Sequence, residues 1–246
     1  MAKQDLDYNS IGERYLDFMK TAPHIKVEVR AILDRIGDAQ GKSVLDLACG
    51  NGYFGRKLRN LGASKVVGID ISEKMIALAR AKSKQCGDDV EFHVRNVCDM
   101  ELFGKFDLVV AAWLFNYAES CADLEKMFQS VANHLKPSGK LVAYTISPDY
   151  QLEVDNYDIY GIHILSKEPW QGGYRYQAEF LSTPPSAFTF YQWSREDYER
   201  AIEKAGFSQF EWKKASVLDS DIKLYSDSFW QIFQQNCLNI SLTCHY

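Results

Sequence analysis

The sequence has few of the residues that mark several common protein classes. Its six cysteines are scattered over 246 residues, without C-x-x-C pairs and without histidines at metal-ligand spacing. We therefore predict neither a metal site nor a disulfide framework. Glycine and proline are sparse and no segment recurs at a fixed period, which argues against flexible linkers, low-complexity tails and repeat architectures.

Excess positive charge and long apolar runs are also missing. The chain has 28 lysine and arginine residues against 33 aspartate and glutamate residues, which gives a formal net charge of −5. This balance offers no electrostatic footprint for a nucleic-acid backbone. The N-terminal residues lack the regions of a signal peptide, and no apolar run approaches membrane-spanning length. We therefore expect a cytoplasmic protein that binds neither nucleic acid nor membrane.

The most informative segment is 42–57, which reads KSVLDLACGNGYFGRK. A short apolar run ends at a glycine-rich turn and is followed by a helical pattern, which predicts strand, tight loop and helix. Gly50 and Gly52 lack β-carbons at the point where backbone N–H groups can approach a ligand. The next apolar run, KVVGID, ends at Asp70, 20 residues after Gly50 (70 − 50). This spacing places a carboxylate where it can bind a ribose diol, so the predicted ligand contains a nucleoside.

Two kinds of nucleoside ligand are compatible with this loop. Gly50, Gly52 and Gly55 satisfy the G-x-G-x-x-G fingerprint, which favours NAD(P) and keeps an oxidoreductase as an alternative. Asp46 argues against it, because a carboxylate at the end of the strand repels a pyrophosphate but not an ammonium or sulfonium group. Two further features argue against a dinucleotide-binding domain. About forty residues precede the strand, whereas such a domain usually begins with it, and too little chain follows the core for a separate substrate domain.

Four ordered motifs, covering roughly residues 40–146, resemble those of class I S-adenosylmethionine-dependent methyltransferases. The first runs from Asp46 to Gly52, with Ala48 where the family usually has glycine. The others are VGIDIS at 67–72, FDLVVAA at 106–112 and HLKPSGKL at 134–141. The resemblance implies S-adenosylmethionine as cofactor, S-adenosylhomocysteine as product and a small molecule as methyl acceptor. We expect a monomer or a homodimer.

Two further segments resemble the N-methyltransferases of toxoflavin-type azapteridine biosynthesis. They are AWLFNYA at 112–118, and Pro184-Pro185 followed by FYQWSR at 190–195. This resemblance implies methylation of a planar nitrogen heterocycle by direct displacement. Ala48 departs from the family pattern, as does Asn96, which stands where the family commonly has an acid facing the adenine. These departures leave a third alternative, a non-catalytic protein that binds S-adenosylmethionine.

The alternation of apolar patterns predicts an α/β fold. We expect a doubly wound, Rossmann-like sheet of seven mostly parallel strands, with an N-terminal helical lid and an antiparallel, aromatic-rich insertion after the fifth strand. The predicted single domain comprises the lid (1–40), a cofactor-binding core (41–146), a substrate cap (147–194) and a C-terminal part that completes the sheet (195–246).

The patterns also predict individual elements. The N-terminal helices span 4–36 with a break at Thr21-Ala22-Pro23. The core should contain strands at 43–48, 65–70, 89–95, 106–112 and 139–146, with helices at 53–61, 73–86 and 121–135. Beyond it we expect paired strands at 174–180 and 188–193, a helix capped by Ser194, strands at 207–212 and 240–244, and a helix at 226–235.

The resemblance, carried over residue by residue, implies a set of cofactor contacts. These are Tyr8, Tyr15, Ala48, Gly50, Gly52, Tyr53, Asp70, Ile71, Met75, Asn96, Val97, Ala112 and Tyr117. Aromatic side chains are dense between Tyr144 and Trp193, which favours a flat acceptor. The predicted substrate contacts are Tyr8, Trp113, Asn116, Tyr144, Tyr174 and Trp193.

Methyl transfer depends mainly on alignment, so a catalytic base is not required. If the acceptor must lose a proton, the candidate bases are Asn116, Tyr117 and Tyr144, together with His24 and His163. Asp107, at the start of the fourth predicted strand, is expected to be structural.

Overall fold

A computed structural model describes residues 7–246, except for five side chains near the start of the first helix (Asp7, Asn9, Ser10, Ile11 and Glu13). The predicted helical segment from residue 4 and the lid from residue 1 therefore begin outside the described residues. In the described part, α1 (Asp7–Thr21) and α2 (Ile25–Ile36) are separated near Pro23, as the sequence predicts.

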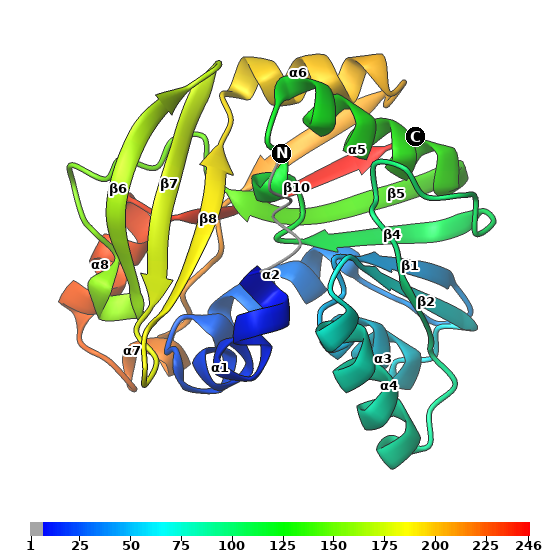
Figure 1. Cartoon of the computed structure of the whole chain (residues 1–246), viewed down its shortest axis with the longest axis horizontal. Helices are drawn as coiled ribbons and strands as arrows, with labels where there is room; N and C mark the ends of the chain where they lie inside the picture. Colours follow the sequence, from blue (N-terminus) through cyan, green and yellow to red (C-terminus); the bar gives the residue numbers. More distant parts are fainter. Residues whose placement is uncertain (1–6) are drawn as a thin grey trace.

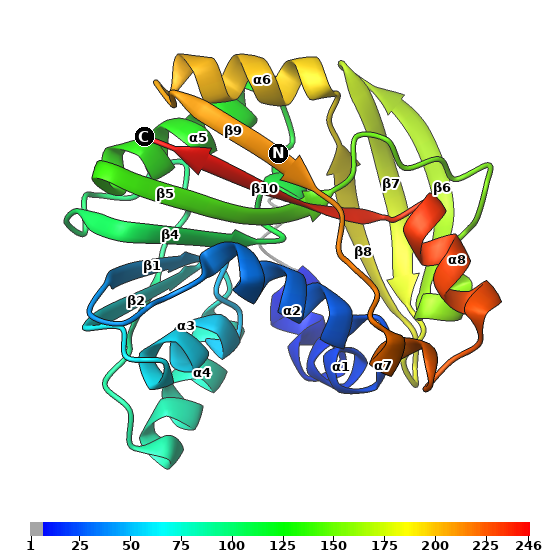
Figure 2. The same ribbon diagram turned by 180° about the vertical axis from the view of Figure 1, so that it is seen from behind.

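A central seven-stranded sheet has the order β3-β2-β1-β4-β5-β10-β9 (Figures 1 and 2). Its strands are β1 (Ser43–Leu47), β2 (Lys65–Asp70), β3 (Glu91–Val94), β4 (Phe106–Ala112), β5 (Leu135–Ile146), β9 (Gln209–Lys213) and β10 (Asn239–His245). Neighbouring strands from β1 to β5 pair in parallel, whereas β10 runs antiparallel to both β5 and β9. The predicted mostly parallel, doubly wound sheet is confirmed.

Helices cover both faces of this sheet, which explains why its central strands are almost continuously apolar. Figure 1 shows α2, α3 (Tyr53–Asn60) and α4 (Glu73–Cys86) on one face, with α5 (Cys121–His134) and α6 (Arg195–Lys204) on the other. The predicted cap of α6 is confirmed, because the Ser194 hydroxyl accepts the N–H of Asp197 at 3.1 Å.

The insertion forms a separate antiparallel sheet of β6 (Ile162–Trp170), β7 (Gly173–Phe180) and β8 (Ser186–Gln192). The predicted pairing of β7 with β8 is confirmed, since Tyr176 lies opposite Phe190 and their rings stack at 4.8 Å between centroids. Strand β6 was not predicted, because Lys167, Glu168 and Pro169 interrupt its apolar alternation. Helix α8 (Asp227–Gln235) packs with Trp230 and Phe233 in the same buried cluster as the inner face of this sheet.

Several other bounds differ from the predictions. Strand β5 begins at Leu135, directly after α5 and ahead of the predicted start at 139, because Leu135 already pairs with Phe106 of β4 before an irregularity in the register. The short elements η1 (Phe115–Tyr117), η2 (Asp158–Tyr160) and α7 (Asp219–Ile222) were not predicted, since each is too short for a periodic pattern. Among residues 7–246, no helix combines the length and apolar character needed to cross a membrane.

Candidate active site

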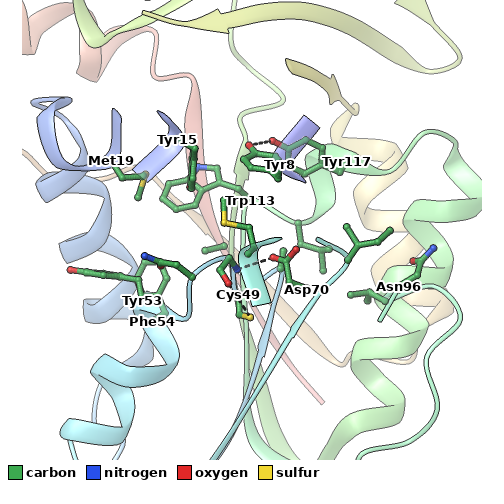
Figure 3. Close-up of a pocket in the computed structure, with 18 of the residues that line it drawn as sticks. Tyr8, Tyr15, Met19, Cys49, Tyr53, Phe54, Asp70, Asn96, Trp113 and Tyr117 are labelled. Atoms are coloured by element: carbon green, nitrogen blue, oxygen red, sulfur yellow. Dashed lines mark hydrogen bonds between the residues drawn. The ribbon is translucent and has the colours of Figure 1, made fainter. Parts of the chain in front are cut away.

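A cavity of about 1490 Å³ lies at the carboxyl ends of the parallel strands. Its walls come from the loops that follow β1, β2, β3 and β4 and from the inner sides of α1 and α2. Figure 3 shows side chains from these separate segments converging on it. This is the edge at which open α/β sheets bind ligands, and the cavity is large enough for a nucleoside cofactor together with a small acceptor.

The loop after β1 forms the floor of the cavity with Ala48, Cys49 and Gly50. A β-carbon on Gly50 would meet no protein atom within 4 Å, because the backbone there borders open space. Ala48 has a φ of 52°, in the left-handed region that costs an ordinary residue roughly 1–2 kcal/mol. This conformation is the physical reason why glycine would be favoured at position 48.

Gly52 and Asp46, both in the first motif, hold the β1 loop in place without lining the cavity. Gly52 is not part of the cavity wall; it begins α3 with a φ of 76°, and a β-carbon there would collide with the Phe92 ring. Asp46 is buried beneath the loop, where its Oδ2 accepts the N–H of Gly55 at 2.9 Å. Burial raises the pKa of Asp46 to about 7, although the hydrogen bond from Gly55 opposes the shift. Both residues thus fix the loop and do not line the cavity.

Asp70 is held in place at the end of β2 by backbone donors. Its Oδ2 accepts the N–H of Gly50 and its Oδ1 accepts the N–H of Ser72, each at 2.8 Å. Burial raises the pKa of Asp70, and these donors oppose that shift. Each carboxylate oxygen can accept a further hydrogen bond, and Asp70 lines the cavity (Figure 3), so it can bind two adjacent hydroxyls.

The cavity wall beyond β2 and β3 suits a flat ring. Ile71, Met75 and Val97, three of the predicted cofactor contacts, give it an apolar surface. Asn96 also lines it, but its side-chain oxygen accepts the N–H of Cys98 at 2.9 Å in a local turn. The position therefore serves both as a turn residue and as a polar wall. Tyr53 lies on the other side of the β1 loop (Figure 3).

At the end of β4, Ala112, Trp113 and Tyr117 meet helix α1. The hydroxyls of Tyr8 and Tyr117 form a 2.5 Å hydrogen bond across the cavity, above Trp113 (Figure 3). The Tyr8 ring also packs edge-to-face against Tyr15 and Tyr117, with centroids 5.2 and 5.8 Å away. The predicted tyrosines of the N-terminal helix thus cover the β4 end of the cavity.

We expect Tyr8→Phe to weaken binding of S-adenosylmethionine, the predicted cofactor, by about three- to tenfold. The change removes one neutral hydrogen bond of about 0.5–1.5 kcal/mol and leaves the ring packing in place. Calorimetric titration measures the effect, and Tyr225→Phe, on the exposed segment before α8, is the matched control. Equal affinity of all three proteins would contradict a role of the Tyr8 hydroxyl in covering the cofactor.

Three predicted substrate contacts do not reach the cavity and are corrected here. Tyr174 lies at the outer end of β7, 40% exposed and 4.2 Å beneath the Lys167 ammonium group. Trp193 is 1% exposed and donates its indole N–H to the carbonyl of Ala118 in the main core. Tyr144 is buried behind Trp113, with ring centroids 5.7 Å apart. Aromatic density predicted a ring-rich region without showing which rings face inward.

Several wall residues were not predicted as ligand contacts. They include Leu16, Met19, Cys49, Phe54, Leu114 and Met127. Leu16 and Met19 could have been found from the sequence, because they continue the helical face that begins with Tyr8 and Tyr15. The others are neighbours of predicted residues in loops whose path no periodic pattern specifies.

A side pocket of about 50 Å³ shares Tyr8, Tyr15, Trp113 and Tyr117 with the main cavity. It lies between α1, α2 and the inner face of the three-stranded sheet. Its apolar wall contains Phe18, Ile146, Ile162, Phe180, Phe188, Phe190 and Leu238, and its polar residues are His24, Glu28, Asn116 and Asn239.

Three candidate bases, His24, Asn116 and Tyr117, therefore line this side pocket, whereas Tyr144 and His163 do not. Burial lowers the pKa of His24 to about 3, so its imidazole is neutral. His163 lies at the surface, where its Nδ1 is 2.7 Å from the carboxylate of Asp158. The structure thus removes His163 from the site.

Comparison with known proteins agrees with this geometry. Residues 44–139 match the family described as "Methyltransferase domain". A demethylmenaquinone methyltransferase of Lactococcus lactis subsp. lactis (strain IL1403) is 31% identical over 194 residues, which cover 74% of this chain and 72% of that protein. A ubiquinone biosynthesis O-methyltransferase of Coxiella burnetii (strain Dugway 5J108-111) is 28% identical over 189 residues, 75% of each chain.

The chain spans 60% to 75% of the length of such curated relatives. A solved S-adenosylmethionine-dependent methyltransferase from Mesorhizobium loti has the same fold, with a TM-score of 0.65 at 21% identity over 93% of this chain and 100% of that chain. These similarities overturn both the NAD(P)-dependent oxidoreductase and the non-catalytic alternative. The chain belongs to the class I S-adenosylmethionine-dependent methyltransferases.

Proposed function

We propose that this enzyme methylates a small planar nitrogen heterocycle, with a toxoflavin-type azapteridine as the most specific candidate. The observation that carries the proposal is the side pocket, whose wall contains Phe180, Phe188 and Phe190 and which shares Trp113 with the cofactor cavity. Aromatic walls favour rigid, flat ligands, because stacking buries both faces of a ring. A pocket of about 50 Å³ has room for one edge of such a ring, while the remainder lies in the main cavity.

The proposed cofactor arrangement follows the strand order. Asp70 would bind the ribose, Ile71, Met75, Asn96 and Val97 would surround the adenine, and the β4 end would hold the methionine part. When bound, S-adenosylmethionine supplies an activated methyl group together with its leaving group. The residues around Trp113 would exclude water and align the acceptor nitrogen, and such alignment is worth about 7–11 kcal/mol of the barrier.

The names of the curated relatives favour a second candidate, the ring of a quinone precursor. Such a ring is also flat, and it would fit the same aromatic walls. The polar residues of the side pocket favour the heterocycle, because lactam and ring-nitrogen groups can satisfy Asn116, Asn239 and Glu28.

The experiment is a methyl-transfer assay with S-adenosylmethionine and a panel of acceptors. The panel contains an unmethylated pyrimidotriazinedione, lumazine and xanthine, and a demethylated quinol is the comparison. We expect S-adenosylhomocysteine to form with at least one heterocycle, with the new methyl group on a ring nitrogen by NMR. Turnover of the quinol alone would favour the second candidate and contradict the proposal.

A further inference from the structure

We propose that Glu28, with Asn116 and Asn239, forms the recognition site for the polar edge of the acceptor, and that Glu28 acts there as a neutral hydrogen-bond donor. The inference rests on the proposed heterocyclic acceptor and deepens it. It concerns the polar part of the side-pocket wall, to which three elements far apart in the sequence contribute: α2, η1 and β10.

Glu28, in the first turn of α2, is only 1% exposed. The amide nitrogen of Asn239 donates to Oε1 at 2.9 Å, whereas Oε2 makes no hydrogen bond of good geometry among the described residues, although the Tyr144 hydroxyl faces the carboxyl group. A buried carboxyl oxygen without a partner is costly unless a ligand satisfies it. Such a group in a pocket wall is therefore expected to contact the acceptor.

Two amide oxygens in the same pocket wall share this property. The side-chain oxygens of Asn116 and Asn239 are buried and have no partner within the described part of the chain. A protonated Glu28 donates one hydrogen bond, whereas these oxygens accept. Together they match the edge of a lactam, in which a carbonyl or bare ring nitrogen accepts and an adjacent ring N–H donates.

The titratable groups that face Glu28 are themselves neutral and do not stabilise a carboxylate. His24 Nε2 lies 3.7 Å away, but burial lowers the pKa of His24 and leaves it neutral. Tyr15 from α1, Tyr144 from β5, Tyr157 from the segment before η2 and Cys237 from the segment before β10 also face it, and burial raises the pKa of each.

No lysine, arginine or charged histidine among the described residues pairs with Glu28. Desolvation accordingly raises the pKa of Glu28 to about 8, and the interactions with the Asn239 amide and the Tyr144 hydroxyl offset only part of this shift. The carboxyl group can thus donate a hydrogen bond at neutral pH and loses this ability above pH 8.

The test measures binding of the unmethylated pyrimidotriazinedione to enzyme saturated with S-adenosylhomocysteine, by calorimetry between pH 6.5 and 9. The variants are Glu28→Gln, which keeps a donor and an acceptor but cannot ionise, and Glu28→Leu, which has neither. Glu211→Gln, on exposed β9, is the matched control. This readout does not depend on turnover.

We expect Glu28→Leu to weaken acceptor binding by about tenfold or more at pH 7, with unchanged affinity for S-adenosylhomocysteine. Glu28→Gln should bind nearly as well as wild type at pH 7 and better than wild type at pH 9. The ratio of the two affinities isolates Glu28, because ionisation of the acceptor itself is the same for both proteins.

Two results would overturn the inference while leaving the proposed acceptor class intact. One is equal acceptor binding by wild type, Glu28→Gln and Glu28→Leu. The other is wild-type binding that strengthens relative to Glu28→Gln as the pH rises through 8, because the carboxylate would then be the binding form. Failure of wild type to bind any heterocycle of the panel would overturn the acceptor class itself, and the recognition site with it.

Discussion

Replacement of Asp70 by alanine should weaken binding of S-adenosylmethionine by at least about tenfold, and by more than a hundredfold if both ribose hydroxyls are lost as partners. A hydrogen bond to a charged group is worth about 1.5–3 kcal/mol, and Asp70 offers an oxygen to each hydroxyl. Calorimetric titration with S-adenosylmethionine measures this loss directly.

The structure adds an effect on stability, because the Asp70 carboxylate also accepts the N–H groups of Gly50 and Ser72. The variant should therefore also melt at a lower temperature than wild type. Part of the affinity loss will come from a β1 loop that is no longer tied to β2.

Asp107→Ala separates these two contributions. Like Asp70, Asp107 accepts a backbone N–H, that of Ser43 at 2.9 Å. It lies at the start of β4, however, and therefore at the opposite edge of the sheet. It pairs with Lys136 at 2.8 Å, and this contact lowers its pKa to about 2. The control should lose stability and keep its affinity for the cofactor. Similar affinity losses in the two variants would remove Asp70 from the binding site.

Substitution of Glu28 by glutamine should make the free energy of unfolding less sensitive to a rise in pH between about 5 and 8. The folded protein holds the Glu28 proton up to about pH 8, whereas the unfolded chain releases it near pH 4.5. Raising the pH between these values therefore favours the unfolded state, so this group's stabilising contribution is full below about pH 4.5 and falls towards pH 8. The glutamine variant has no such proton and should become the more stable protein as the pH rises.

The expected change in relative stability is roughly 1 kcal/mol for each pH unit between about pH 5 and 8. Urea unfolding at pH 5.5, 6.5 and 7.5 provides the measurement, and Glu211→Gln should give a curve parallel to that of wild type. The lowered pKa of His24 acts equally on both proteins and cancels in the comparison. Parallel curves for wild type and Glu28→Gln would show that Glu28 titrates normally in the folded protein.

The cofactor half of the site could be predicted because its chemistry is local in the sequence. The β1 loop and the segment after β4 each follow a strand and Asp70 ends one, and parallel strands bring their carboxyl ends to one edge. Trp113 and Tyr117 lie at this edge as expected.

The acceptor half could not be predicted in the same way. Glu28 stands among apolar residues of α2, and only the packing of β10 and the three-stranded sheet over that helix buries it. Trp193 shows the converse, because the chain turns into α6 beyond β8 and carries this ring into the main core. Contacts between distant segments decide which side chains face a cavity, and single-segment patterns do not encode them.

Helix α1 contributes Tyr8, Tyr15 and Met19 to both the large cavity and the side pocket. Any displacement of this helix that frees the cofactor also removes one wall from the acceptor. Exchange of the two ligands is therefore kinetically linked through a single helix, and a substitution that loosens α1 should speed release of both products together.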